Sequence, residues 1–139
     1  REVSNLVFLR LPAVMNDLHA RAMGKIVLAN MDKEDVEAFL KENELTARTP
    51  NTIVDPEILT EDLKLSKERG YSINNEEYIK GLISIGAAVF NYNAGRVTGA
   101  VSLDFPACEY TLEQIEAKYT GILTKLASEV SEIFTISDI

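Results

Sequence analysis

Two apolar segments joined by a short turn constrain the fold of this chain more than any other feature. The first covers residues 81–91 and the second covers residues 96–105, and the residues between them are Tyr92-Asn93-Ala94-Gly95. Asn and Gly tolerate the backbone angles of tight turns, so residues 93–95 are expected to form a three-residue hairpin loop with Gly95 at positive φ. The centre of the chain is therefore predicted to be an antiparallel β-hairpin.

With that loop, Tyr92 opposes Arg96, and the resulting register determines which side chains share a face. One face is apolar and is expected to lie under helices. It carries Ile83, Ile85, Ala87, Val89, Val97, Gly99, Val101 and Leu103. The other face places Ser84 opposite Asp104 and Gly86 opposite Ser102, beside Leu82, Ala88 and Ala100.

This second face is open to two interpretations. It is either the solvated side that antiparallel sheets commonly have, or the floor of a pocket in which small residues leave room for a ligand. A change of one residue in the loop length would turn one strand over and separate the cluster.

The rest of the chain is predicted to be mostly helical. Residues 6–11 form a short apolar run typical of a strand, and residues 18–31 have helical spacing. Three further helices have start signals, namely Asp32, the pair Asp55-Pro56 with a stop at Gly70, and Thr111 with Gln114 as a capping box. The predicted class is α/β in the mixed, α+β sense, with helices packed on one face of an antiparallel-rich sheet.

Length and charge limit the possible partners. A chain of 139 residues suits a single domain, residues 1–139. Its 14 Lys and Arg against 22 Asp and Glu give a net charge of −8, which disfavours direct binding of nucleic acid. No apolar stretch is long enough to span a membrane, and the single cysteine, Cys108, fits the reducing cytoplasm. Because the chain starts at Arg1 rather than Met, we expect a fragment of a longer protein.

Motifs for catalysis and for metal binding are weak. His19 is the only histidine, so a hydrolase would need it beside Ser84 or Ser102. One His and one Cys leave no nitrogen and sulfur ligand set for a metal. The run Asn74-Asn75-Glu76-Glu77 offers oxygen ligands for a hard cation, although such a polar run is more often a solvated turn. No catalytic residue, metal site or cofactor is therefore predicted.

Three motifs occur in an order that resembles one protein family. They are L-H-A-R-A-M-G-K at residues 18–25, R-T-P-N-T-I at residues 48–53 and R-G-Y-S-I-N-N-E-E at residues 69–77. Together with the two strands of the hairpin, they resemble the C-terminal effector-binding domain of IclR-type (isocitrate lyase regulator-type) transcriptional regulators over residues 11–134. Two features depart from the family pattern: Asn74 and Asn75 replace aspartates, and residues 1–11 are shorter than the family's usual front segment.

The resemblance implies a sensor domain of GAF/PAS-like fold that assembles as a homodimer or homotetramer. It implies that DNA is bound only through an N-terminal winged helix-turn-helix domain, which is absent from this chain. It also implies a small-molecule effector, such as an organic acid, keto acid or sugar acid. The effector-binding residues carried over from the family are Ala22, Met23, Gly24, Asn74, Leu82, Ser84, Ser102 and Asp104. Three of these, Ser84, Ser102 and Asp104, also form the polar cluster that the hairpin register predicts.

A mechanism of effector binding follows from the ends of the elements. If a helix begins near Ala22, its free backbone N–H groups are placed to receive a carboxylate, while Ser84 and Ser102 orient hydroxyl or keto oxygens. Asp104 stands where the family often has Ser, and a buried carboxylate near an anionic ligand is costly unless it is protonated or accepts a hydrogen bond from the ligand. We therefore expect an effector with hydroxyl, amine or amide donors. Three alternatives stay open, namely an Asp104 that points to solvent, a small hydrolase and a ligand-free dimerisation module.

Overall fold

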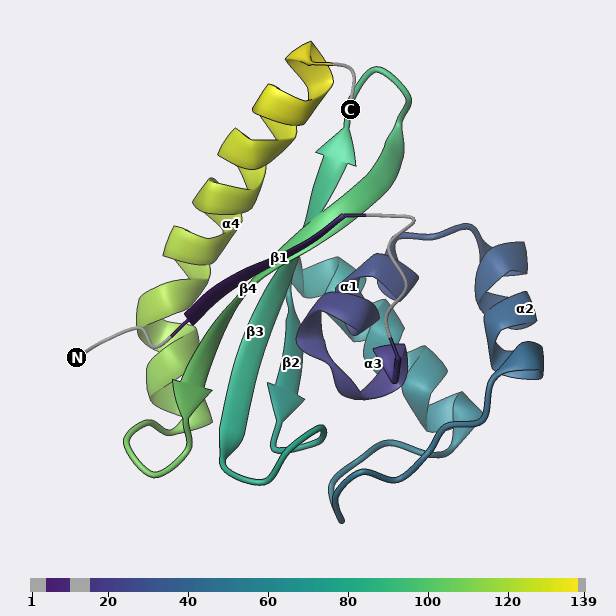
Figure 1. Ribbon diagram of the computed structural model, residues 1–139, viewed down its shortest axis with the longest axis vertical. Coiled ribbons are helices and arrows are strands. Elements are labelled where there is room, and N and C mark those ends of the chain that lie inside the picture. Colours follow the sequence, from purple (N-terminus) through teal and green to yellow (C-terminus); the bar gives the residue numbers. More distant parts are fainter. Residues whose placement is uncertain (1–4, 11–15, 138–139) are drawn as a thin grey trace.

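A computed structural model of the chain describes residues 5–10 and 16–137. Its elements in chain order are β1 (Asn5–Arg10), the 3-10 helix η1 (Leu18–Ala20), α1 (Ala22–Ala29), α2 (Lys33–Glu42), α3 (Pro56–Arg69), β2 (Ser72–Asn75), β3 (Leu82–Asn91), β4 (Arg96–Pro106) and α4 (Leu112–Ile136). The four strands form one antiparallel sheet in the order β1-β4-β3-β2 (Figure 1). The α+β class and the antiparallel sheet are as predicted.

Helix boundaries follow the capping signals in the sequence. Asp55 Oδ1 accepts the backbone N–H of Glu57 at 2.8 Å at the start of α3, and Gly70 ends that helix with φ of 92°. Thr111 forms the predicted capping box at the start of α4. Strand β1 overlaps the predicted strand 6–11, whose last residue, Leu11, lies outside the described residues.

The central hairpin has the predicted register over most of its length, although its loop differs from the predicted one. Its loop has four residues rather than three, because Asn91 pairs with Arg96. A β-bulge then follows, since Phe90 pairs with Val97 but Val89 pairs with Gly99, which leaves one extra residue in β4. The extra residue restores the pairing, so that the predicted pairs Ser84 with Asp104 and Gly86 with Ser102 both form.

Helices cover both faces of the sheet, so the prediction of helices on one face is wrong (Figure 1). Helix α4 packs on the apolar face formed by alternate residues such as Ile85 and Leu103. Helix α1 packs on the opposite face, where Ala88 and Ala100 meet Ile26. The small side chains of the two alanines and the lack of a side chain at Gly86 let α1 approach this part of the face closely. The part of the face that carries Ser84, Ser102 and Asp104 is polar.

The bulge also moves one side chain to the other face. Val97 belongs to the cluster beneath α1 rather than to the α4 face that the three-residue loop predicted. The reason is that a strand reverses the direction of its side chains when one residue is inserted.

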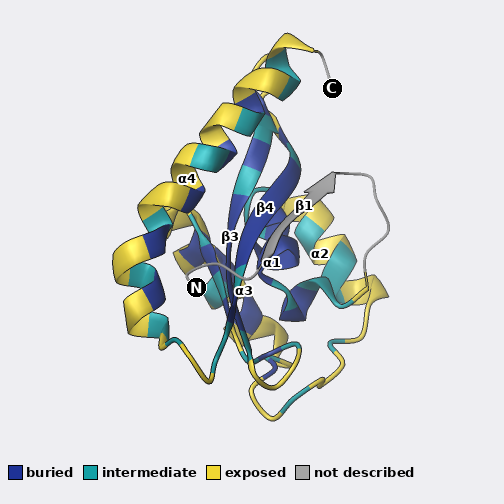
Figure 2. Cartoon of the chain, turned by 60° about the vertical axis from the view of Figure 1, so that its left-hand side comes forward, coloured by how far each residue is buried: buried dark blue, intermediate teal, exposed yellow. Residues whose placement is uncertain are grey.

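Helix α4 also contacts the edge of β3. Strand β2 pairs with β3 only as far as Gly86. Further along, the backbone N–H groups of Phe90 and Tyr92 donate to Ser131 Oγ and Thr135 Oγ1 of α4, each at 2.9 Å. The inner side of α4 is buried and its outer side is exposed, as Figure 2 shows.

A phenol on the sheet side of α4 gives a test of this packing. Tyr71 Oη donates to Glu116 Oε2 at 2.6 Å, and burial, followed by this hydrogen bond, raises the pKa of Tyr71 above its usual value of 10.0. Because the folded-state pKa is raised, this stabilisation is complete below pH 10 and is lost as the pH rises through the folded-state pKa. We expect the free energy of unfolding to fall more steeply above pH 10 in the wild type than in Tyr71→Phe. Equal slopes in urea titrations across pH 9–11.5 would contradict this prediction.

Candidate functional site

A hollow of about 80 Å³ lies where the N-terminus of α1 faces the polar half of the sheet. Its lining residues are Arg21, Ala22, Met23, Asn74, Tyr78, Leu82, Ser84, Ser102 and Asp104. Every residue carried over from the family lines this hollow except Gly24. Three separate segments of the chain therefore converge on one site: the start of α1, the turn after β2, and the β3–β4 pair.

The floor of the hollow is the polar face of the hairpin. Ser84 and Ser102 are each only 3% exposed, and Ser102 Oγ donates to Asp104 Oδ1 at 3.3 Å. This bond uses the proton of Ser102, so its oxygen is left to accept from a ligand. The hydroxyl of Ser84 makes no hydrogen bond to any residue in the described part of the chain, although its side chain is buried. Asp104 lines the hollow rather than pointing only to solvent.

The N-terminus of α1 forms one wall. Its N-cap residue, Arg21, has an extended backbone and provides no side-chain cap, and Ala22 and Met23 are the first helical residues. The first N–H groups of a helix have no acceptor within the helix, and the positive end of the helix dipole lies there. This wall therefore has the chemistry of an anion site.

Gly24 has a structural explanation instead of a place in the lining. A Cβ added to it would lie 2.3 Å from the backbone oxygen of Leu18 and 2.5 Å from Leu18 Cα. The third residue of α1 therefore faces η1, and glycine is needed so that the two helices can approach so closely.

Asn74 contributes to the opposite wall. Its Oδ1 accepts the backbone N–H groups of Glu77 at 2.8 Å and of Tyr78 at 3.3 Å, which closes the turn after β2. The residue is 2% exposed, and its Nδ2 has no partner within residues 16–137. An aspartate at this position would make the same two bonds, so the asparagine keeps the turn and adds a hydrogen-bond donor.

This turn does not resemble a cation site. The oxygens of Asn74 and Glu77 are directed at backbone N–H groups and at the ammonium of Lys25. Within the described residues, no group of three or more His, Cys, Asp or Glu side chains is arranged to hold a metal.

One cationic residue and one aromatic ring in the lining, Arg21 and Tyr78, were not predicted from the sequence. The guanidinium of Arg21 lies over the Tyr78 ring, 3.9 Å from its centroid, and donates to the Tyr78 hydroxyl. Arg48, which does not line the hollow, also approaches this ring, with its guanidinium carbon 5.5 Å from the ring centroid. The position of Arg21 directly before a helix start was the available signal, whereas nothing in the sequence pairs it with Tyr78.

His19 lies outside this site. It is buried, and its Nε2 donates to the carbonyl of Thr46 at 2.8 Å. It lines a different hollow of about 340 Å³ beside α2, whose lining carries Asp17 and Glu44. A hydrolase with His19 as its base would need this ring beside Ser84 or Ser102, and neither serine shares a hollow with it.

Comparison with known proteins identifies a family whose model covers all three segments of the site. Residues 13–132 match the model of the family described as bacterial transcriptional regulator IclR C-terminal. The chain is 34% identical over 117 residues to the HTH-type transcriptional regulator KdgR of Dickeya chrysanthemi, covering 84% of this chain and 38% of that protein. The chain therefore spans well under half of the length of this relative.

Solved structures agree with this fold. The crystal structure of Thermotoga maritima IclR has a TM-score of 0.83 at 29% identity, covering 94% of this chain and 61% of the other. A complex of a double mutant of the PobR inducer-binding domain from Acinetobacter with 3-hydroxybenzoic acid has a TM-score of 0.81 at 19% identity, covering 91% of this chain and 86% of the other. At this identity, the match shows a likeness of fold alone.

An antiparallel sheet with a helix N-terminus over its polar half defines an α+β sensor domain. The chain belongs to the IclR family of bacterial transcriptional regulators and corresponds to the C-terminal effector-binding domain. The relatives that it matches are regulators of transcription rather than enzymes. No helix in residues 16–137 combines the length and the apolar composition that a membrane span requires.

Proposed function

We propose that this domain binds a small organic acid in the hollow at the N-terminus of α1, and that binding modulates DNA binding by a winged helix-turn-helix domain elsewhere in a homodimeric or homotetrameric regulator. The observation that carries the proposal is the convergence of three unpaired groups on one hollow. These are the uncapped start of α1, the Nδ2 of Asn74 and the hydroxyl of Ser84. Polar groups that line a hollow and have no protein partner are available to hydrogen-bond a ligand, which supports a polar ligand in this hollow.

The polarity of the hollow supports an effector with two different ends. The start of α1, Arg21 and Asn74 present donors and positive charge, which suit a carboxylate. Asp104 lies on the floor with Ser102 and suits a hydroxyl, amine or amide donor. An acid that also carries such a donor satisfies both ends.

The size of the hollow favours a compact effector. The hollow holds about 80 Å³ and is partly open to solvent. Hydroxy, keto or amide acids of two to four carbons suit this space, whereas aromatic acids and six-carbon sugar acids would extend beyond its lining. A double mutant of the PobR domain forms a complex with 3-hydroxybenzoic acid, so this fold can hold a hydroxylated acid.

A thermal-shift screen with a hollow-filling variant tests the proposal. A compound at about a hundred times its Kd adds about 2.7 kcal/mol of stability, which is a shift of roughly 10 °C. In Ser84→Leu the side chain occupies most of the hollow, so the shift should disappear. Ser84→Ala is the matched control, because it removes one hydrogen bond and should weaken binding by about tenfold or less. A hit whose shift survives Ser84→Leu would bind elsewhere and would contradict the proposed site.

Asp104 should determine which acids bind. In Asp104→Ser, we expect hydroxy and amide acids to lose at least tenfold in affinity relative to keto acids, because the charged acceptor for their donor is gone. The matched control is Asp35→Ser on the exposed side of α2, which removes the same charge far from the hollow. Calorimetric titration of lactate, glycolate and pyruvate measures the ratio, and an unchanged order of preference would refute this role.

A further inference from the structure

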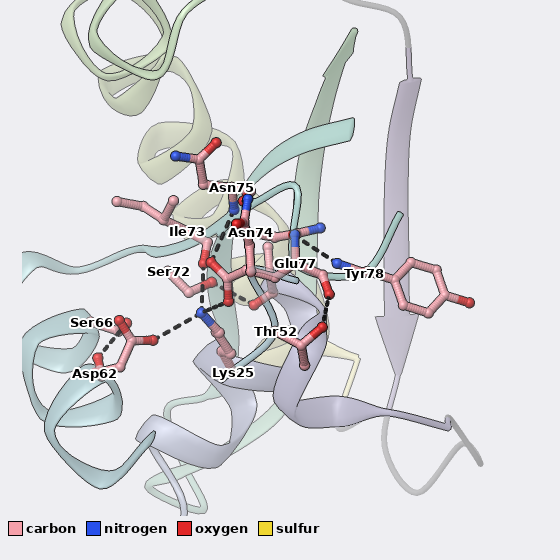
Figure 3. A network of polar contacts seen from close by, with 12 residues as sticks. Lys25, Thr52, Asp62, Ser66, Ser72, Ile73, Asn74, Asn75, Glu77 and Tyr78 are labelled. Carbon is pink, nitrogen blue, oxygen red and sulfur yellow. Dashed lines mark hydrogen bonds and ion pairs between the residues drawn. The ribbon is translucent and has the colours of Figure 1, made fainter. Parts of the chain in front are cut away.

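A fully buried ammonium lies behind the hollow. The side chain of Lys25, one turn into α1, is 1% exposed, and its Nζ contacts Asp62 Oδ2 at 3.0 Å, Glu77 Oε1 at 2.6 Å and the carbonyl of Ile73 at 2.9 Å (Figure 3). Three acceptors match the three protons of the ammonium group. These contacts join α1 to α3 and to the segment that begins with β2.

Only one of the two acids also holds the turn at the wall of the hollow. The second oxygen of Glu77, Oε2, accepts the backbone N–H of Asn75 at 3.0 Å. The backbone of Glu77 is fixed as well, since its N–H donates to Asn74 Oδ1 and its carbonyl accepts from Thr52 Oγ1 at 2.5 Å. Asp62 has no such contact with the turn and instead accepts, through its backbone carbonyl, from Ser66 (Figure 3).

We propose that Glu77 is the positioning residue of the effector site, because its carboxylate ties the turn that carries Asn74 and Tyr78 to Lys25 at the start of α1. This inference rests on the proposed function, because it requires the hollow to be the effector site. Glu77 does not line the hollow and would act on it through the turn. The bridge of Lys25 and Glu77 is the buried, charged contact between the donor wall and the start of α1. Two further contacts cross the same gap, since Arg21 donates to the Tyr78 hydroxyl and Ser72 Oγ donates to the carbonyl of Ala22.

The chemistry of the bridge requires both oxygens of a carboxylate. One oxygen accepts from an ammonium and the other accepts from a backbone N–H, so each is committed to a donor. In Glu77→Gln, a single oxygen has to serve one of these partners, and the NH2 group then faces the other donor. The variant is therefore nearly isosteric and breaks one end of the bridge.

Asp62→Asn is the matched control. It removes a carboxylate from the same ammonium and has nearly the same shape, but it leaves the turn after β2 untouched. Asp62 is 25% exposed, so water replaces part of the lost interaction. Comparing the two variants separates the positioning of the wall from the stabilisation of a buried charge.

Amide hydrogen exchange on the unliganded chain gives the first readout. In Glu77→Gln, the amides at positions 77 and 78, which donate to Asn74, should exchange at least tenfold faster, while the core amides of Ile85 and Leu103 keep their rates. In Asp62→Asn, all four amides should change by less than threefold. Equal acceleration in both variants, or no local acceleration in Glu77→Gln, would overturn the proposal.

Titration with sodium glycolate gives the second readout. Its Kd should rise at least tenfold in Glu77→Gln and less than threefold in Asp62→Asn, and an equal rise in both would show a general structural role and overturn the proposal. If the wild type fails to bind glycolate and every other acid of the screen, the proposed effector class is wrong. The exchange rates at positions 77 and 78 still decide whether Glu77 orders the wall, so the two failures can be told apart.

Discussion

Replacement of Lys25 by Met is expected to lower the free energy of unfolding by about 3 kcal/mol, the largest loss that we predict for any single charge in this domain. The substitution leaves Glu77 and Asp62 facing each other without a cation, and removing one partner of a buried ion pair typically costs about 3–5 kcal/mol. The partial exposure of Asp62 places the expected loss at the lower end of that range.

Urea unfolding of matched variants measures this effect. Lys64→Met, on α3 at an exposed position, is the control and should change stability by less than about 0.5 kcal/mol. The double variant of Lys25→Met with Glu77→Gln should lose less than the sum of the two single variants, because the second substitution removes one of the stranded charges. A loss below about 1 kcal/mol for Lys25→Met would mean that the three side chains do not form a coupled cluster.

Gly24→Ala is expected to destabilise the domain by about 2–3 kcal/mol, although alanine is normally the better helix former by about 1 kcal/mol. The added methyl group would lie 2.3–2.8 Å from three backbone atoms of Leu18, so η1 or α1 has to move. Overpacking of this kind costs about 1–3 kcal/mol, and here the neighbour is backbone that cannot rotate away.

The matched control is the same substitution in a helix with open space. Gly121 lies in α4, and a Cβ added to it would meet nothing within 4 Å. Gly121→Ala should therefore stabilise the domain by about 0.5–1 kcal/mol, opposite in sign to Gly24→Ala. If both variants are stabilising in thermal unfolding, the close approach of α1 to η1 is not a constraint on this fold.

The predictable parts of the fold are those that depend on neighbours in the chain. The cap of α3 at Asp55 and the capping box of α4 each involve residues within three positions of one another, so the sequence contains the whole interaction. The hairpin shows the limit of this approach. A loop one residue longer than predicted is offset by a bulge at the step between Val89 and Phe90, and the predicted pairing is restored from Val89 onward. The side of the sheet on which α1 packs depends on three-dimensional contacts that no local pattern specifies.

The candidate site also has parts that the sequence predicts and parts that it does not. The floor was predictable because the period of two along β3 and β4 brings Ser84 and Asp104 together once the register is right. Arg21 and Tyr78 are 57 residues apart, and they meet only because α1 packs over the sheet next to the turn after β2. Gly24 shows the opposite case, since a residue inside the family motif turns out to face η1.

The hydroxyls that α4 places along the border of β3 have a consequence for the behaviour of this chain at high concentration. An unpaired strand border is a template on which a foreign strand can add, and natural proteins commonly blunt it. Here Ser131 and Thr135 occupy the N–H groups of Phe90 and Tyr92, so an incoming strand could pair with these two groups only after displacing α4. Helix α4 therefore protects the part of the β3 border that lies beyond the end of β2 against the addition of a foreign strand.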